Sequence, residues 1–217
     1  MELRILSVNV GKPRMLSAQG QQSVLSGIAK HPVVQSRIFV AQTNIDGDGQ
    51  ADLSVHGGVD KAVYAYPADH RFWWEAKGIA AGAAAFGENL TLEGAVEDAI
   101  AIGDLFQWGE AILEVSQPRG PCFKLGMYTG RSDAPQLMTV SGRCGWYFRV
   151  VSQGEAPVAG ASCIRISASG KSSVQEAFAA AYHGNVPLEI LERVHAAPAL
   201  AASWRETIGK RIKGRTA

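Results

Sequence analysis

Up to about residue 167, the sequence is a succession of short segments with the composition of β-strands. Each segment is rich in Val, Ile, Tyr or Phe, and Gly, Pro, Asn and Asp occupy the stretches between them, as in strands joined by tight turns. Many short strands with glycine-rich connections predict either a closed barrel or a sandwich. One helix, from about Ala68 to Lys77, is expected to interrupt them. The strand-like segments are Leu3 to Val10, Arg37 to Thr43, Ala62 to Tyr66, Ile112 to Gln117, Gly145 to Val151 and Ala161 to Ile166.

After residue 167 the pattern changes from strand-like to helical. Ser173 and Glu176 have the spacing of a capping box ahead of an alanine-rich run, which predicts the start of a helix. Pro187 marks the start of a second helix. A third helix is indicated by apolar residues at every fourth position, namely Leu200, Trp204 and Ile208. We therefore predict a mainly β domain over residues 1–167 and a three-helix subdomain with its own apolar seam over residues 168–217.

Composition and cysteine usage limit the classes to which the chain can belong. A net charge of +1 over 217 residues gives no reason to expect a nucleic-acid polymer as a partner. No apolar run approaches the roughly 18 residues of a membrane-spanning helix, and the N-terminus lacks the layout of a signal peptide. The three cysteines form no CxxC pair and cannot all be disulfide-bonded within the chain, so we expect a reduced, cytoplasmic protein.

One of these cysteines, Cys122, ends the run Gln-Pro-Arg-Gly-Pro-Cys at residues 117–122. Each proline fixes its own φ angle and biases the preceding residue away from the helical region, so the run predicts a rigid, non-helical turn. Such a turn is suited to holding one thiol at the mouth of a pocket. Arg119 places positive charge nearby, and positive charge favours the thiolate, the form that attacks electrophiles and binds metals.

Two further segments have the composition of a binding site for a charged group. Residues 55–61 combine a histidine, two glycines and a lysine, as expected of an anion cradle. Residues 86–90 place Glu88 and Asn89 on a glycine turn ahead of a strand-like segment. Together with Cys122, these segments predict a cysteine-centred site for a charged cofactor.

Four stretches of the chain, in their order, resemble the MOSC family of domains, which are related to the C-terminal part of molybdenum cofactor sulfurases. They are residues 52–67, 86–91, 117–125 and 141–150. The three helices that follow resemble the small helical domain appended to one bacterial subgroup, which is similar to proteins that reduce 6-N-hydroxylaminopurine. The resemblance covers nearly the whole chain.

This resemblance implies a mainly β fold, a β-barrel over residues 1–167, that binds the molybdenum cofactor, in which a pyranopterin dithiolene (molybdopterin) holds the metal. Cys122 stands at the position of the protein ligand to the molybdenum and would be the catalytic residue, and a soft thiolate suits that metal. The pterin carries a phosphate or a nucleotide diphosphate, so its site needs cations and backbone N–H groups. The candidate cofactor-binding residues are His56, Gly57, Gly58, Lys61, Glu88, Asn89, Arg119, Lys124, Arg143 and Arg149.

The resemblance further implies a reductase that converts small N-hydroxylated compounds, such as N-hydroxylated nucleobases and amidoxime-like molecules, to amines. Flavin and iron–sulfur binding signatures are absent from the sequence, so the electrons are expected from an external electron-donor reductase. Pyridoxal phosphate is not expected, because the chain is too short to include the desulfurase that the sulfurases carry. A homodimer is expected only by resemblance.

Other interpretations of the same residues stay open. The domain could be a carrier that binds molybdenum cofactor, or a persulfide on Cys122, without turnover. A cysteine hydrolase would need a histidine base beside the thiol, and the sequence does not place one. Arg143 and Arg149 could be ordinary surface arginines, His56 a hydrogen-bonding plug and Glu88 the cap of its own turn.

Three further features are interpreted as structural. Cys144 is assigned no role, and Cys163 lies in an alternating strand and is expected in the core. Residues 46–52 begin like a calcium-binding loop, but Gly57 stands at the twelfth position, where a bidentate glutamate is needed. We interpret that segment as a turn ahead of the His-Gly-Gly motif.

Overall fold

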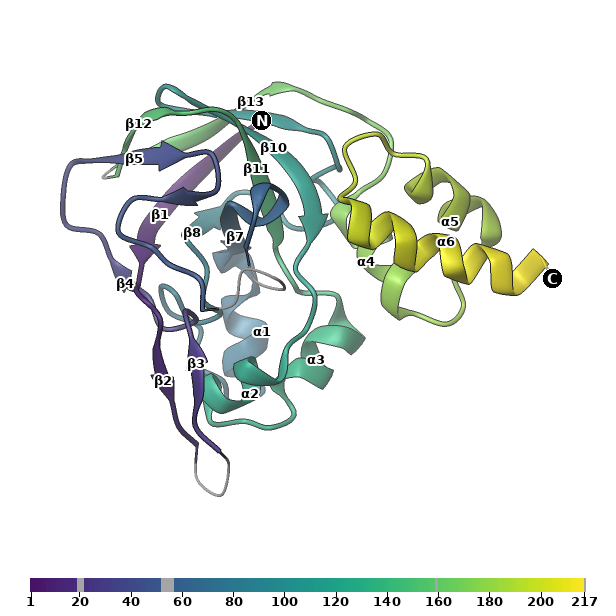
Figure 1. The fold of residues 1–217 in the computed structure, drawn as a ribbon, viewed down its shortest axis with the longest axis horizontal. Helices are drawn as coiled ribbons and strands as arrows, with labels where there is room; N and C mark the ends of the chain where they lie inside the picture. The colour runs from purple at the N-terminus through teal and green to yellow at the C-terminus, as the bar shows by residue number, and fades with distance from the viewer. Residues whose placement is uncertain (19–21, 52–56, 159, 217) are drawn as a thin grey trace.

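The structure is a computed structural model that describes residues 1–18, 22–51, 57–158 and 160–216. At its centre is a closed seven-stranded barrel rather than a sandwich (Figure 1). Neighbouring strands are antiparallel except β7 and β8, and the pairing of β13 with β1 closes the barrel. In order around the barrel, the strands are β1 (Glu2–Val10), β8 (Leu90–Glu93), β7 (Val63–Pro67), β11 (Trp146–Ser152), β10 (Ala111–Pro118), β9 (Leu105–Trp108) and β13 (Ser162–Ser167).

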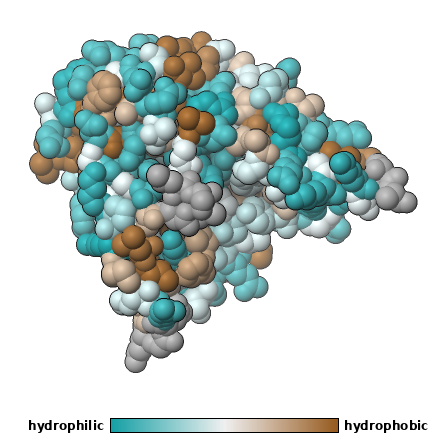
Figure 2. All heavy atoms as spheres, in the orientation of Figure 1, coloured by the Kyte–Doolittle hydropathy of each residue, from teal (hydrophilic) through white to brown (hydrophobic). Residues whose placement is uncertain are grey.

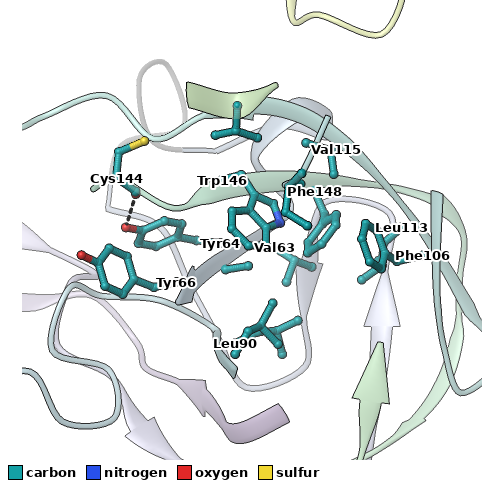
Figure 3. Packing of buried hydrophobic residues seen from close by; sticks show 14 of the residues in the cluster. Val63, Tyr64, Tyr66, Leu90, Phe106, Leu113, Val115, Cys144, Trp146 and Phe148 are labelled. Atoms are coloured by element: carbon teal, nitrogen blue, oxygen red, sulfur yellow. Dashed lines mark hydrogen bonds between the residues drawn. The ribbon is translucent and has the colours of Figure 1, made fainter. Parts of the chain in front are cut away.

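Aromatic and branched side chains fill the barrel. In β10 the inward positions Leu113 and Val115 are buried and alternate with partly exposed ones, as the two-residue period of a strand requires. Phe148 lies among them in Figure 3, with its ring centroid 5.7 Å from that of Phe106 and 6.2 Å from that of Trp146. Both pairs meet edge to face, the arrangement that aromatic rings prefer, and they give the core a defined packing.

Smaller elements surround the barrel. The strand β4 (His31–Pro32) pairs with the end of β1, and the hairpin of β2 (Arg14–Leu16) and β3 (Val24–Ser26) projects away from the barrel (Figure 1). A second sheet consists of β12 (Gly154–Pro157), β5 (Arg37–Ala41) and β6 (Asn44–Ile45). The short helices are η1 (Val59–Lys61), η2 (Ala68–His70), α1 (Arg71–Glu75), α2 (Phe123–Thr129) and α3 (Ala134–Ser141).

The six predicted strands are present as β1, β5, β7, β10, β11 and β13, and the predicted helix is present as η2 and α1. The helices α2 and α3 were not predicted. Cys122 has extended backbone angles, φ −141° and ψ 141°, so the turn itself is non-helical as expected, but α2 begins at the next residue. A proline restricts the residue before it and leaves the residues after it free to be helical. In α3, Pro135 lies within the first turn, where its missing N–H is not needed.

Three helices follow the barrel, as predicted: α4 (Val174–Tyr182), α5 (Leu188–His195) and α6 (Ala202–Thr216). They pack together at one side of the barrel (Figure 1). The capping box forms, because Ser173 accepts a hydrogen bond from the backbone N–H of Glu176 and the Glu176 carboxylate accepts one from that of Ser173, both at 3.1 Å. We refer to residues 173–216 as the helical unit.

The apolar seam predicted for the helical unit is present. Phe178, Leu191, Trp204 and Ile208 are buried, but they belong to the same continuous hydrophobic cluster as the barrel core. The apolar core of the helical unit is therefore continuous with that of the barrel.

The outer surface shows no continuous apolar belt on the face in Figure 2, where hydrophobic side chains form small separate groups on a largely hydrophilic background. Within the described residues, none of the helices combines the length and the apolar character needed to cross a membrane.

Candidate functional site

A cleft in the barrel domain brings together segments that are far apart in the sequence. It lies between the end of β3, the turn after β6, the start of β7, the turn before β8 and the turn between β10 and α2. Among the candidate residues, it is lined by Lys61, Asn89, Arg119, Cys122 and Lys124.

Cys122 stands where the turn after β10 meets the first residue of α2, and it is partly exposed in the cleft. The other two cysteines are fully buried. Burial raises the pKa of the Cys163 thiol to about 12 and that of the Cys144 thiol well above its usual value. Cys122 is therefore the cysteine whose exposure suits ligand binding, while Cys163 lies in the core as predicted.

Arg119 is a buried cation at the inner end of the cleft, with 7% of its surface exposed. Its guanidinium lies 5.7 Å from the ring centroid of Tyr64, and its Nη1 donates to the sulfur of Met138 at 3.0 Å. Within the described part of the chain, Arg119 forms no ion pair with a carboxylate. A buried charge is costly unless an opposite charge accompanies it. The cleft thus holds a preformed position for an anionic group.

A buried polar network forms another wall of the cleft. Lys30 is ion-paired with Asp48, and both side chains are almost completely buried. Asp48 also accepts hydrogen bonds from the backbone N–H of Gly11 and from the Asn89 amide, each at 2.9 Å. Asn89 in turn donates to the backbone carbonyl of Asn9 at 3.1 Å and accepts from the backbone N–H of Tyr64 at 3.0 Å.

Sequence reasoning missed two members of this network. Lys30 has no flanking motif, and Asp48 was interpreted as part of a turn, although the Asp-Gly-Asp-Gly sequence was a signal that carboxylates gather there. Burial lowers the pKa of Lys30, and the carboxylate of Asp48 opposes that effect. Burial likewise lowers the pKa of Lys61, with Asp60 opposing it.

Glu88 does not line the cleft, and its alternative interpretation as a turn cap fits better. One carboxylate oxygen accepts from the backbone N–H of Phe86 at 3.0 Å, and the other accepts from the Thr91 hydroxyl at 2.8 Å. Burial raises its pKa, and these hydrogen bonds partly offset the rise. Glu88 therefore shapes the turn that presents Asn89.

Arg149 also lies outside the cleft. Its guanidinium is paired with Asp60, at 2.6 Å between Nη2 and the carboxylate, and with Glu114. The hydroxyl of Ser116 donates to the backbone carbonyl of Asp60 at 2.6 Å. These contacts anchor η1, whose last residue, Lys61, lines the cleft. We therefore assign Arg149 an anchoring role in place of the expected contact with the cofactor.

Arg143 is likewise absent from the lining of the cleft. Its guanidinium lies over the indole of Trp73, 4.6 Å from the ring centroid, and its backbone carbonyl accepts from the Tyr66 hydroxyl at 3.1 Å. The neighbouring carbonyl of Cys144 accepts a hydrogen bond from the Tyr64 hydroxyl (Figure 3).

Gly57 and Gly58 are also outside the lining of the cleft, and the φ of +89° at Gly58 requires a glycine before η1. His56 lies outside the described residues.

Comparison with known families agrees with this architecture. The model of the MOSC domain matches residues 52–166, more than half of the chain. The chain belongs to the MOSC domain family. In this MOSC protein, residues 173–215 also match the model of the YiiM-like 3-alpha helix domain.

Three named proteins are similar in sequence or structure to this MOSC protein. YflK of Bacillus subtilis (strain 168) is 42% identical over 209 residues, which cover 95% of this chain and 93% of YflK. The crystal structure of YiiM from Geobacillus stearothermophilus has a TM-score of 0.79 at 35% identity, over 97% of this chain and 99% of that one. A protein of Gibberella moniliformis (strain M3125 / FGSC 7600) named "Reductase" is 36% identical over 122 residues, 54% of this chain and 22% of that protein.

MOSC domains are associated in general with the molybdenum cofactor, and the donor set of this cleft fits that group. Within the described residues, no cluster of three or more His, Cys, Asp or Glu side chains could hold a metal ion by itself. A metal bound at Cys122 would therefore bring most of its ligands with it, as a dithiolene cofactor does. Its phosphate would meet the cations that line the cleft, Arg119, Lys30, Lys61 and Lys124.

Proposed function

We propose that this MOSC protein is a molybdenum-cofactor-dependent reductase that converts N-hydroxylated compounds to amines. The observation that carries the proposal is the pairing, in one cleft, of a partly exposed thiol at Cys122 with the buried cation of Arg119, which has no carboxylate partner among the described residues. A soft thiolate beside an anion position is the donor set for a metal that arrives on a phosphorylated, sulfur-bearing ligand.

When bound, the molybdenum cofactor supplies the two-electron redox chemistry that cleavage of the N–O bond requires. The protein contributes the Cys122 thiolate as a metal ligand and holds the phosphate through Arg119 and the cleft lysines. Asn89 already uses its amide for Asp48 and for two backbone groups. Its role is therefore to fix the wall of the cleft rather than to read the edge of the pterin.

Reduction of an N–OH group to N–H with release of water consumes two electrons and two protons. Lys30 and Lys61 hold protons at Nζ in the cleft, and burial lowers the pKa of both, so they release a proton more readily than exposed lysines. The electrons come from an external electron-donor reductase. The match to a protein named "Reductase", of which the aligned part is 22%, supports an oxidoreductase role.

The experiment that tests this function combines metal content with turnover. The protein is produced in a host that makes molybdenum cofactor, and molybdenum is measured by elemental analysis. Reduction of an N-hydroxylated purine is then measured with an artificial electron donor. We expect molybdenum to be retained and the purine to be reduced. Retention of molybdenum without turnover would identify a cofactor carrier instead, and absence of molybdenum would refute both the reductase and the cofactor carrier.

A further inference from the structure

The helical unit touches the turn that carries Cys122 where the end of α4 meets Gly120. A methyl group added at Gly120 would lie 2.8 Å from the hydroxyl oxygen of Tyr182 and 3.8 Å from the ring carbon that bears it. A carbon–oxygen separation of 2.8 Å is too short for any side chain, whereas 3.8 Å is an ordinary van der Waals contact. Tyr182 therefore lies directly against the backbone of the turn.

The contact with Tyr182, and not a positive φ, limits the size of the residue at position 120. The residue is not among the glycines with positive φ, so the conformation of the turn is open to other residues. A larger residue at Gly120 would have to displace either the Tyr182 side chain or the turn. The two residues are thus complementary in size, one on the cysteine turn and one at the end of α4.

The end of α4 is itself fixed. The ring of Tyr182 packs against those of Phe178 and Trp204, at centroid distances of 4.9 and 5.8 Å. Arg211 of α6 donates to the backbone carbonyl of Ala180 at 2.5 Å and to that of His183. These are carbonyls that the end of a helix leaves without partners, so α6 caps α4.

The helical unit is also tied to the barrel beside the cysteine turn. His183 makes a hydrogen bond of 2.7 Å with the backbone carbonyl of Thr139 in α3. The N–H of Ala201 donates at 3.0 Å to the carbonyl of Ser116 in β10, the strand that leads into the turn. Tyr182, whose surface is 44% exposed, is therefore held relative to β10 and α3, where it lies against the turn between β10 and α2.

We propose that the helical unit positions the Cys122 thiol through the contact between Tyr182 and Gly120. Tyr182 is a positioning residue that acts through the backbone of the turn, two residues before the thiol and next to Arg119. Its consequence for catalysis rests on the proposed function, in which Cys122 is the metal ligand. A ligand displaced by a fraction of an ångström is enough to weaken a reaction that depends on its placement.

The test is a size-complementation experiment on the protein without metal. Four proteins are compared: wild type, Gly120→Ala, Tyr182→Phe and the double variant. The readout is the rate at which iodoacetamide alkylates Cys122, located by peptide mass mapping. The buried Cys144 and Cys163 in each protein report on general loosening. Gly184→Ala is the matched control, because a methyl group there meets nothing within 4 Å.

We expect Gly120→Ala to change the alkylation rate of Cys122 at least about threefold, since overpacking displaces the backbone. Tyr182→Phe and Gly184→Ala should stay near the wild-type rate. The double variant should return to it, because the hydroxyl oxygen that clashed is gone. An unchanged rate in Gly120→Ala, or no recovery in the double variant, would overturn the proposal. So would a rise in the modification of Cys144 and Cys163 that matches the change at Cys122.

Tyr182→Ala keeps the proposal testable if Gly120→Ala does not fold. Removing the ring takes away the contact without adding a clash, so Cys122 should react faster, and a wild-type rate would contradict the proposal. With molybdenum bound, turnover per molybdenum should fall in Gly120→Ala and recover in the double variant. Absence of turnover in the wild type would count against the proposed function alone, because the alkylation rates are measured without metal.

Discussion

On one side of the cleft, Lys30, Asp48 and Asn89 are joined by an ion pair and a hydrogen bond, and their side chains are almost completely buried. On the other side, the turn that carries Cys122 is held by proline geometry and by the packing of Tyr182 against Gly120. The network joins residues that are distant in the sequence, whereas the turn is a continuous run of six residues, 117–122.

The difference indicates which part of the site contributes mainly to folding stability and which contributes mainly to the reaction. A buried ion pair loses much free energy when one partner is removed, because the other charge stays buried without compensation. A partly exposed thiol can be changed with little effect on folding. We therefore expect substitution of Asp48 in the network to affect mainly the free energy of unfolding, and substitutions in the turn to affect mainly turnover.

The largest effect is expected from Cys122→Ser. A serine oxygen is a harder ligand than a thiolate, so turnover per molybdenum should fall at least about a hundredfold. The free energy of unfolding should change by no more than about 0.5 kcal/mol. Both are measured, by elemental analysis with an activity assay and by denaturant unfolding.

The control for this variant is Cys163→Ala, in the core of the barrel. It should lose about 1 kcal/mol of stability through the small cavity it leaves, with turnover per molybdenum intact. Full turnover per molybdenum in Cys122→Ser would show that this thiol is not the catalytic ligand.

Next in size is the expected loss of stability in Asp48→Asn. The change leaves the buried ammonium of Lys30 without its counter-charge and should cost about 3 kcal/mol in the free energy of unfolding, measured by urea denaturation. The double variant Lys30→Met/Asp48→Asn should be more stable than Asp48→Asn alone. Glu93→Gln, which breaks the exposed pair with Arg4, should cost no more than about 1 kcal/mol. Equal losses in the free energy of unfolding for Asp48→Asn and Glu93→Gln would mean that the buried ion pair contributes no more to stability than the exposed one.

The same contrast explains how far the sequence could predict the fold. Local signals were sufficient for the capping box at Ser173 and for the extended backbone at Cys122, because each depends on neighbours within a few residues. Composition predicted the barrel strands β1, β7, β10, β11 and β13 but not β9. The helix α2 was missed because Pro118 and Pro121 dominated the interpretation of that turn, although neither prevents a helix that begins after it. No element was predicted over residues 134–141, where α3 lies.

In the site, residues were predicted where a motif surrounds them and missed where only the fold brings them together. Lys30 acquires its role from Asp48, and neither residue has a local pattern that requires the other. Arg149 lies next to a motif and was assigned to the cofactor, but its partners are Asp60 and Glu114. Charge and spacing in the sequence indicate that an arginine makes a specific contact. Whether its partner is a bound anion or a carboxylate of the protein depends on tertiary contacts.

The smallest expected effect is a pH dependence of the free energy of unfolding. It measures the free-energy cost of burying Lys30 in the network. Burial lowers the pKa of Lys30 below its ordinary 10.5, with Asp48 opposing the shift. Between the folded-state pKa and 10.5, the unfolded chain binds more protons at this lysine than the folded protein does. The contribution of Lys30 to the free energy of unfolding therefore rises with pH across that interval and is lowest below it.

The measurement compares the free energies of unfolding of wild type and Lys30→Met at about pH 7 and about pH 10. The other titrating groups are common to both proteins, so the difference isolates Lys30. We expect the difference to move in favour of wild type by about 1 kcal/mol or less as the pH rises. A movement in the opposite direction would mean that the attraction of Asp48 outweighs burial. The Lys30–Asp48 ion pair would then stabilise the charged form of the lysine. The network and the Cys122 turn would still differ in how far apart their residues lie in the sequence, but not in the free-energy cost of burial.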